Sequence, residues 1–277
     1  MIFTTKTILN FSIKYLPIIT TNLAITAFLA VTPLQVKAAT LVNSRAALES
    51  NDQIDWSSLG KVYNPFNPNP NPADFLPNSF SATSQGGLGM NVNIPNFPGV
   101  TPPFVFKTST IPQGVPTNFA DGDFVLFTGL RPGTFPAIGN PGPITINFDK
   151  PVFAAGTQIT VDDTPEFTAF ISAFDQADNL LGSFSIQGTS SLLLDNSASF
   201  LGIRSDTANI SRLVFSSSVP NRALGINRVS IVAVPEPNPS LAFLLVGVSG
   251  TILRLRQRSK GISSPKFTKT DTKDLNF

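Results

Sequence analysis

The side chains of this chain that could do chemistry are carboxylates, because the 277-residue sequence contains no histidine and no cysteine. Without histidine, the usual general base at neutral pH and the commonest transition-metal ligand are missing. Without cysteine, thiolate nucleophiles, disulfides and cysteine-bound metals are excluded. Most enzyme classes are therefore difficult to build from these residues.

The densest group of carboxylates is Asp162, Asp163 and Glu166, which surround a Thr-Pro pair. A glycosidase needs two carboxylates that face each other about 5 to 10 Å apart. Adjacent residues at a strand end point to opposite faces, so one of this pair would need a partner from another loop. We interpret the group as a solvated turn and predict no catalytic residue and no enzyme, with a carboxylate-based hydrolase as an alternative.

Two oxygen-rich segments, residues 121–123 (Asp-Gly-Asp) and 175–179 (Asp-Gln-Ala-Asp-Asn), offer atoms that calcium prefers. Neither segment matches an EF-hand loop, and both have the composition of ordinary turns. We therefore predict no cofactor and no metal ligand, with calcium as the alternative.

Carbohydrate-binding sandwiches commonly combine flat aromatic rings with a few polar groups. Apart from phenylalanine, the aromatic residues between positions 39 and 234 are Trp56 and Tyr63. Most phenylalanines alternate with polar residues, as core positions do. A lectin-like module that contacts sugar through Trp56 or Tyr63 is therefore a second hypothesis.

The elements that must position these residues are short strands. Residues 144–148 (Ile-Thr-Ile-Asn-Phe) alternate apolar and polar side chains, as a half-buried strand requires. Turn-forming residues separate further runs of this kind, at 158–161, 166–174, 181–186, 198–203, 210–215 and 225–233. This spacing predicts an all-β fold, an antiparallel β-sandwich with a jelly-roll-like arrangement.

Residues 64–103 are dense in proline and asparagine, which predicts loops. Apolar residues nevertheless recur through and just beyond this stretch, which favours short edge strands with long connections: Phe75, Phe80, Leu88, Val92, Ile94, Phe104 and Phe106. We predict one domain over residues 39–233, with a loop-rich part at 39–103.

The N-terminus has the order of a secretory signal. Lys6 and Lys14 precede a largely apolar stretch at 16–31, and Val36-Lys37-Ala38 places small residues before a cleavage site. We predict a signal helix within residues 1–38 and cleavage after Ala38. A membrane anchor that is retained is the alternative.

The C-terminus carries Pro235-Glu236-Pro237, then an apolar segment, then a basic cluster. We predict a single hydrophobic transmembrane helix at 239–253 and a basic polar tail at 261–277. The membrane stop consists of Arg254, Arg256 and Arg258, which would remain cytoplasmic. A proline-rich linker before a peripheral helix is the alternative.

This combination over residues 234–260 resembles the PEP-CTERM sorting signal of exosortase substrates. The resemblance implies that Pro235, Glu236 and Pro237 are read by a membrane-embedded exosortase while the helix holds the precursor in the inner membrane. Residues 118–123 and 151–159 also resemble the body of secreted proteins that carry this tail, which implies a β-sandwich.

The basic residues of the chain gather at its ends. The formal net charge is +2, but residues 39–234 contain nine Lys or Arg against fourteen Asp or Glu, a difference of −5. An acidic body does not suit a nucleic-acid backbone. We predict an exported, non-enzymatic envelope or extracellular-matrix protein that is associated with exopolysaccharide, with the export machinery and exosortase as partners.

Overall fold

The computed structural model describes residues 39–235, apart from 68–70, 72–73, 132 and 134–136. The predicted signal with Ala38 lies outside the described residues. So do Glu236, Pro237, the predicted helix at 239–253 and its three arginines. In the described part of the chain, no helix has the length and apolar character needed to cross a membrane.

The described residues form fourteen strands and two single-turn helices, which are in chain order β1 (Thr40–Val42), α1 (Arg45–Leu48), β2 (Asp52–Ile54), η1 (Trp56–Leu59), β3 (Ser79–Thr83), β4 (Gly89–Asn93), β5 (Phe104–Lys107), β6 (Phe124–Phe127), β7 (Ile144–Val152), β8 (Ala154–Val161), β9 (Glu166–Phe174), β10 (Leu180–Thr189), β11 (Ser199–Arg204), β12 (Ile210–Ser217), β13 (Leu224–Ile226) and β14 (Val229–Val232). The all-β prediction is confirmed.

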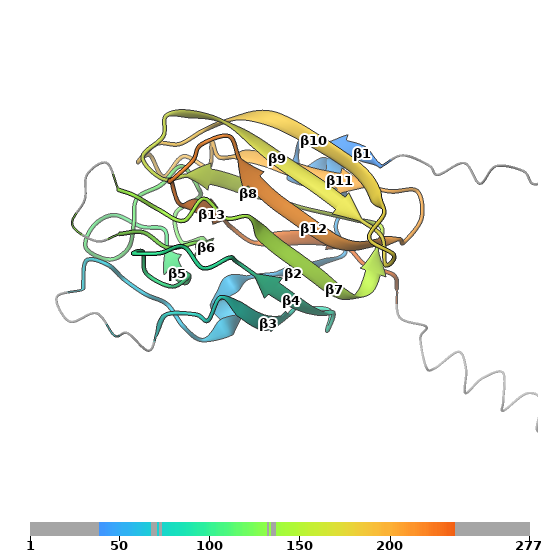
Figure 1. The fold of residues 1–277 in the computed structure, drawn as a ribbon, viewed down its shortest axis with the longest axis horizontal. Coiled ribbons are helices and arrows are strands. Elements are labelled where there is room, and N and C mark those ends of the chain that lie inside the picture. Colours follow the sequence, from blue (N-terminus) through green and yellow to red (C-terminus); the bar gives the residue numbers. More distant parts are fainter. Residues whose placement is uncertain (1–38, 68–70, 72–73, 132, 134–136, 236–277) are drawn as a thin grey trace, which may run out of the picture. The chain divides into compact units, whose positions relative to one another are not determined.

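The strands form two antiparallel sheets (Figure 1). The smaller sheet has the order β10-β9-β12-β7-β4-β3. The larger sheet has the order β1-β11-β8-β13-β6-β5, and β14 follows β13 along the same edge of β8 and pairs with β2. The chain crosses repeatedly between the sheets from β6 to β13, so that β6-β13-β8-β11 faces β7-β12-β9-β10, as in a jelly roll. The predicted antiparallel sandwich is therefore confirmed.

The main core fills the space between the two sheets. Strand β9 shows how the sequence builds it, because Phe167, Ala169, Ile171 and Ala173 are buried between more exposed neighbours. Each large apolar side chain buried in this way stabilises the fold by roughly 1.5 to 3 kcal/mol. The loop-rich part contributes too, since Phe80, Val92 and Ile94 are buried there as predicted.

Strands β5 and β6 are apolar on both faces. Val105 and Leu126 point into the main core. Phe104, Phe106 and Phe127 belong instead to a second cluster on the outer face of the larger sheet, which also contains Phe119, Val125, Ala198 and Ala223. The larger sheet therefore has a second apolar surface, outside the main core.

Candidate functional site

A pocket of about 440 Å³ lies on the outer face of the larger sheet. Strands β5, β6 and β8, the turn 162–165 after β8, the loop between β10 and β11, and residues 115–117 all contribute to its lining. Strands therefore hold Phe104, Phe106, Phe127 and Thr160 in the pocket, and turns and loops supply most of its other residues.

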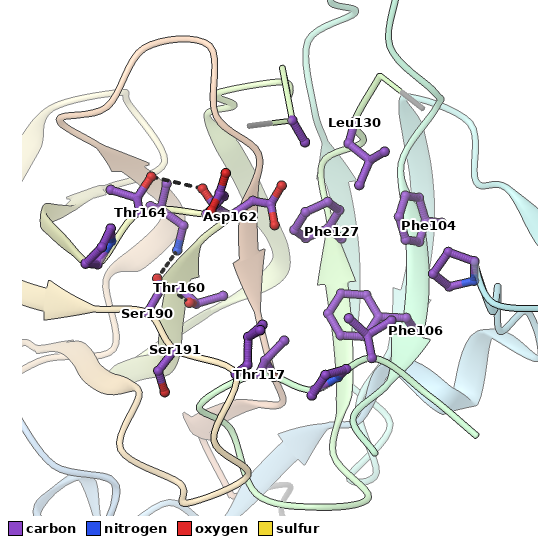
Figure 2. A pocket seen from close by; sticks show the side chains of 18 residues that line it. Phe104, Phe106, Thr117, Phe127, Leu130, Thr160, Asp162, Thr164, Ser190 and Ser191 are labelled. Carbon is purple, nitrogen blue, oxygen red and sulfur yellow. Dashed lines mark hydrogen bonds between the residues drawn. The ribbon is translucent and has the colours of Figure 1, made fainter. Parts of the chain in front are cut away.

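One side of the pocket is apolar. Figure 2 shows Phe104, Phe106, Phe127 and Leu130 together on this side. The ring of Phe127 packs against Phe104 at 5.3 Å and against Phe106 at 5.6 Å between centroids. Leu192, which also lines the pocket, is 75% exposed and extends the apolar surface toward solvent.

The opposite side is polar, and Figure 2 shows Thr160, Asp162, Thr164 and Ser190 there. The hydroxyl groups of Thr160 and Ser190 are 2.7 Å apart, and the Thr164 hydroxyl donates to the backbone carbonyl of Asp162 at 2.9 Å. Thr117 also lines the pocket, and its hydroxyl oxygen is buried without a hydrogen-bond partner. The pocket is therefore two-sided.

The two adjacent carboxylates of the sequence both line this pocket. Asp163 has a left-handed backbone conformation, with φ of 48°, in the turn after β8. The prediction that Asp162 and Asp163 point to opposite faces is therefore wrong, because it assumed that the extended conformation continues past β8. Glu166, the third carboxylate of that group, is exposed at the start of β9 and is not among the residues of the pocket.

The charges of the two carboxylates are unequally compensated. The Asp163 carboxylate lies 3.9 Å from the guanidinium of Arg222, which also donates to the backbone carbonyl of Ala137. Burial and the neighbouring Asp163 raise the pKa of Asp162 to about 6, and Arg222 opposes this shift. Asp162 is therefore a carboxylate whose ionised form is disfavoured by its surroundings.

Gly225 lies between Thr160 and Phe127, which line opposite sides of the pocket. It lies on β13 between β6 and β8, and its neighbours Leu224 and Ile226 belong to the main core. A Cβ atom at this position would lie 3.1 Å from Thr160 Cγ2 and 3.3 Å from Phe127 Cδ2. Sequence reasoning missed both Gly225 and the phenylalanine wall.

A separate polar network is buried beside α1, centred on Asn227 between β13 and β14. The side-chain oxygen of Asn227 accepts from Arg45 Nη2 at 2.9 Å and from the backbone N–H of Gln158 at 3.2 Å. Its amide nitrogen donates to Asp123 Oδ2 at 2.9 Å and to Gln158 Oε1 at 2.7 Å. These groups satisfy one another, so we interpret the network as structural.

The two segments considered for calcium use their oxygens within the protein. Asp123 accepts a hydrogen bond from Asn227, and Asp175 accepts from Asn179 and from the backbone N–H of Ala177. The hydrogen bonds from Asn179 lower the pKa of Asp175. Among the described residues, no three His, Cys, Asp or Glu side chains come together in a way that could hold a metal ion.

The aromatic residues proposed for a lectin do not form a sugar platform. Trp56 is fully buried in the core, and its indole N–H donates to the backbone carbonyl of Asn227 at 2.8 Å. Tyr63 is half-buried and packs against Phe75 and Phe104, with centroids 4.7 and 5.0 Å away. The prediction that Trp56 contacts sugar is therefore wrong, because this ring is not accessible.

The described residues end at Pro235, the first residue of the predicted Pro-Glu-Pro signal. Asn51 accepts from the backbone N–H of Ala233 at 2.8 Å and donates to its carbonyl at 3.1 Å. Val234 is 49% exposed, and Pro235, the last described residue, is also exposed.

No protein-family model and no curated protein matches the chain. Among solved structures, a DUF4465 family protein from Bacteroides caccae is similar at 13% identity and a TM-score of 0.33, over 72% of this chain and 100% of that one. CsCBM6-3 from Clostridium stercorarium, solved in complex with cellobiose, is similar at 10% identity and a TM-score of 0.20, over 58% of this chain and 86% of that one. These scores are too low to transfer a function, so the pocket must be interpreted from its own residues.

Proposed function

We propose that this chain is an exported, non-enzymatic envelope protein whose β-sandwich binds a small amphipathic molecule. The observation behind the proposal is the two-sided pocket, in which phenylalanines face hydroxyl and carboxyl groups across about 440 Å³. Pockets for small molecules usually measure roughly 300 to 1,000 Å³ and combine apolar walls with a few polar groups.

The pocket suits an amphipathic ligand better than a sugar. A sugar ring carries hydroxyl groups around its edge, and each needs a polar partner when it is buried. Here the polar groups are confined to one side, while Phe104, Phe106, Phe127 and Leu130 line the other. Association with exopolysaccharide therefore stays a prediction from the resemblance of the tail, separate from this pocket.

The arrangement of carboxylates favours binding over hydrolysis. Asp162 and Asp163 are neighbours in the chain and both belong to the polar side, whereas a hydrolase places its acid and base on either side of the scissile bond. Incubation with glycoside substrates separates the two functions. A hydrolase would release product and would lose this activity in the Asp162→Asn variant, whereas a binding protein would release no product.

Filling the space at Gly225 tests the pocket as the binding site. We expect Gly225→Val to weaken binding of phenylpropanol at least tenfold, because the new side chain would displace Thr160 and Phe127, which line the pocket. The binding can be followed by NMR chemical shifts of backbone amides that line the pocket. Ser216→Val, on β12 of the smaller sheet, is the matched control and should bind normally. Normal binding by a folded Gly225→Val protein would contradict the proposal.

The proposed sorting is tested at the C-terminus of the mature protein. Ala233 is held by Asn51 while Val234 and Pro235 are exposed, so a processing enzyme would have access to the chain directly after the body. We expect mass spectrometry of protein from the cell envelope to find an N-terminus at Ala39 and a C-terminus near Pro237. Recovery of the intact chain with both termini from the cytoplasm would rule this out.

A further inference from the structure

The pocket carries more negative than positive charge. Its lining includes the carboxylates of Asp162 and Asp163, and none of its described residues is basic. Arg222 lies near Asp163 at 3.9 Å and supplies one positive charge. Two negative charges thus share one positive partner, which leaves the polar side of the pocket with a net charge of −1.

Two polar groups of the pocket lack partners within the protein. Among the described residues, none donates a hydrogen bond to the carboxylate of Asp162. The hydroxyl oxygen of Thr117 is buried and has no hydrogen-bond partner either. The carboxylate oxygens of Asp162 are therefore available to accept hydrogen bonds from a ligand in the pocket. A group with N–H donors and a positive charge would satisfy the Asp162 carboxylate.

The apolar wall limits what this cation can be. A hard metal ion needs several oxygen ligands, yet among the described residues no three acidic, histidine or cysteine side chains come together, and the phenylalanine side of the pocket offers no oxygen. An organic cation can place its hydrocarbon part against Phe106, Phe127 and Leu130 and its charged end toward the carboxylates. Burying the hydrocarbon part contributes roughly 25 cal/mol per Å² of apolar surface.

We propose that the pocket binds a monovalent organic cation, an amine whose ammonium group lies at Asp162 and Asp163 and whose hydrocarbon part lies against the phenylalanine wall. This inference rests on the proposed function, that the pocket binds a small amphipathic molecule, and adds the sign of the ligand's charge. An anionic ligand of the same shape is repelled by the same carboxylates.

Three probes of nearly equal shape test the charge preference: phenylpropylamine, phenylpropanol and phenylpropionate. We expect calorimetry on the full chain at neutral pH to give an affinity for the amine at least tenfold above that for the alcohol, with the carboxylate binding most weakly. Raising the salt concentration should weaken amine binding and leave alcohol binding nearly unchanged.

Variants of the carboxylates connect this preference to the pocket. Asp162→Asn and Asp163→Asn should each reduce the advantage of the amine over the alcohol to less than threefold. Glu166→Gln, three residues further along and outside the pocket, is the matched control and should keep the full advantage.

The possible failures are distinguishable. If the alcohol binds as tightly as the amine, or if neither carboxylate variant changes the preference, the inference about charge is overturned and the binding function stands. If none of the three probes binds, the proposed function fails together with the inference.

Discussion

Asn227→Ala is expected to lower the free energy of unfolding by about 2 to 4 kcal/mol, because more than one polar group of the network would lose its partner. Asn227 is fully buried and uses both ends of its amide, toward Arg45, Asp123 and Gln158. Alanine would leave the Asp123 carboxylate and the backbone N–H of Gln158 without the partner that Asn227 supplies, whereas Arg45 would keep its hydrogen bonds to Ser230 and Gln158. The cost comes from those unpaired groups more than from the lost amide itself.

The position of Asn227 explains why other residues cannot replace it. Strand β8 pairs with β13 and then with β14 along one edge, and Asn227 occupies the gap between them. Its side-chain oxygen accepts the backbone N–H of Gln158, which the strand ladder leaves unpaired there. Burial and the nearby Arg228 lower the pKa of Arg45 to about 10, so Arg45 remains charged at neutral pH. The variant would therefore remove one hydrogen-bond acceptor from a charged, partly buried guanidinium.

Urea denaturation measures this loss directly. Asn93→Ala, an exposed position of β4, is the control and should change the free energy of unfolding by less than about 0.5 kcal/mol. A loss below about 1 kcal/mol in Asn227→Ala would show that water or neighbouring side chains replace the amide.

Strands with one solvated face were predictable from the sequence. The alternation at residues 166–174 matches the bounds of β9, because the core side chains of this strand alternate with side chains outside the core. Strands β5 and β6 show no alternation, since the larger sheet is covered by apolar side chains on both faces. The sequence predicted a strand only at 158–161, which is the second half of β8. The first half shows no alternation either, because all of its residues are buried.

The candidate site was only partly predictable. The sequence pointed to Asp162 and Asp163 as candidate residues. It did not predict that a left-handed turn residue places both of them in one pocket. The phenylalanine wall depends on long-range pairing, in which Phe127 lies opposite Gly225 and Phe104 opposite Phe127. No local pattern indicates such partners. Trp56 was misjudged because a ring with a polar N–H can be buried when a backbone carbonyl accepts from it.

Asp162→Asn is expected to raise the free energy of unfolding by about 2 to 3 kcal/mol at neutral pH and by almost nothing near pH 4. The pKa of Asp162 rises from 3.8 to about 6 on folding. The native state therefore holds the proton more tightly than the unfolded state, and stability falls as the pH rises from about 4 to about 6. Asparagine does not titrate, so the variant avoids this loss.

Urea denaturation from pH 4 to pH 7.5 would reveal the difference between the two proteins growing through this interval, while Asn93→Ala, which replaces a residue that does not titrate, is the control. A variant that is less stable than the natural protein at neutral pH would mean that the Asp162 carboxylate has a partner in the native state. A residue that lowers stability at neutral pH persists where function requires it. Asp162→Asn should therefore gain stability and at the same time lose the preference for amines. Opposite effects of one substitution on stability and on binding would assign the Asp162 carboxylate to ligand binding.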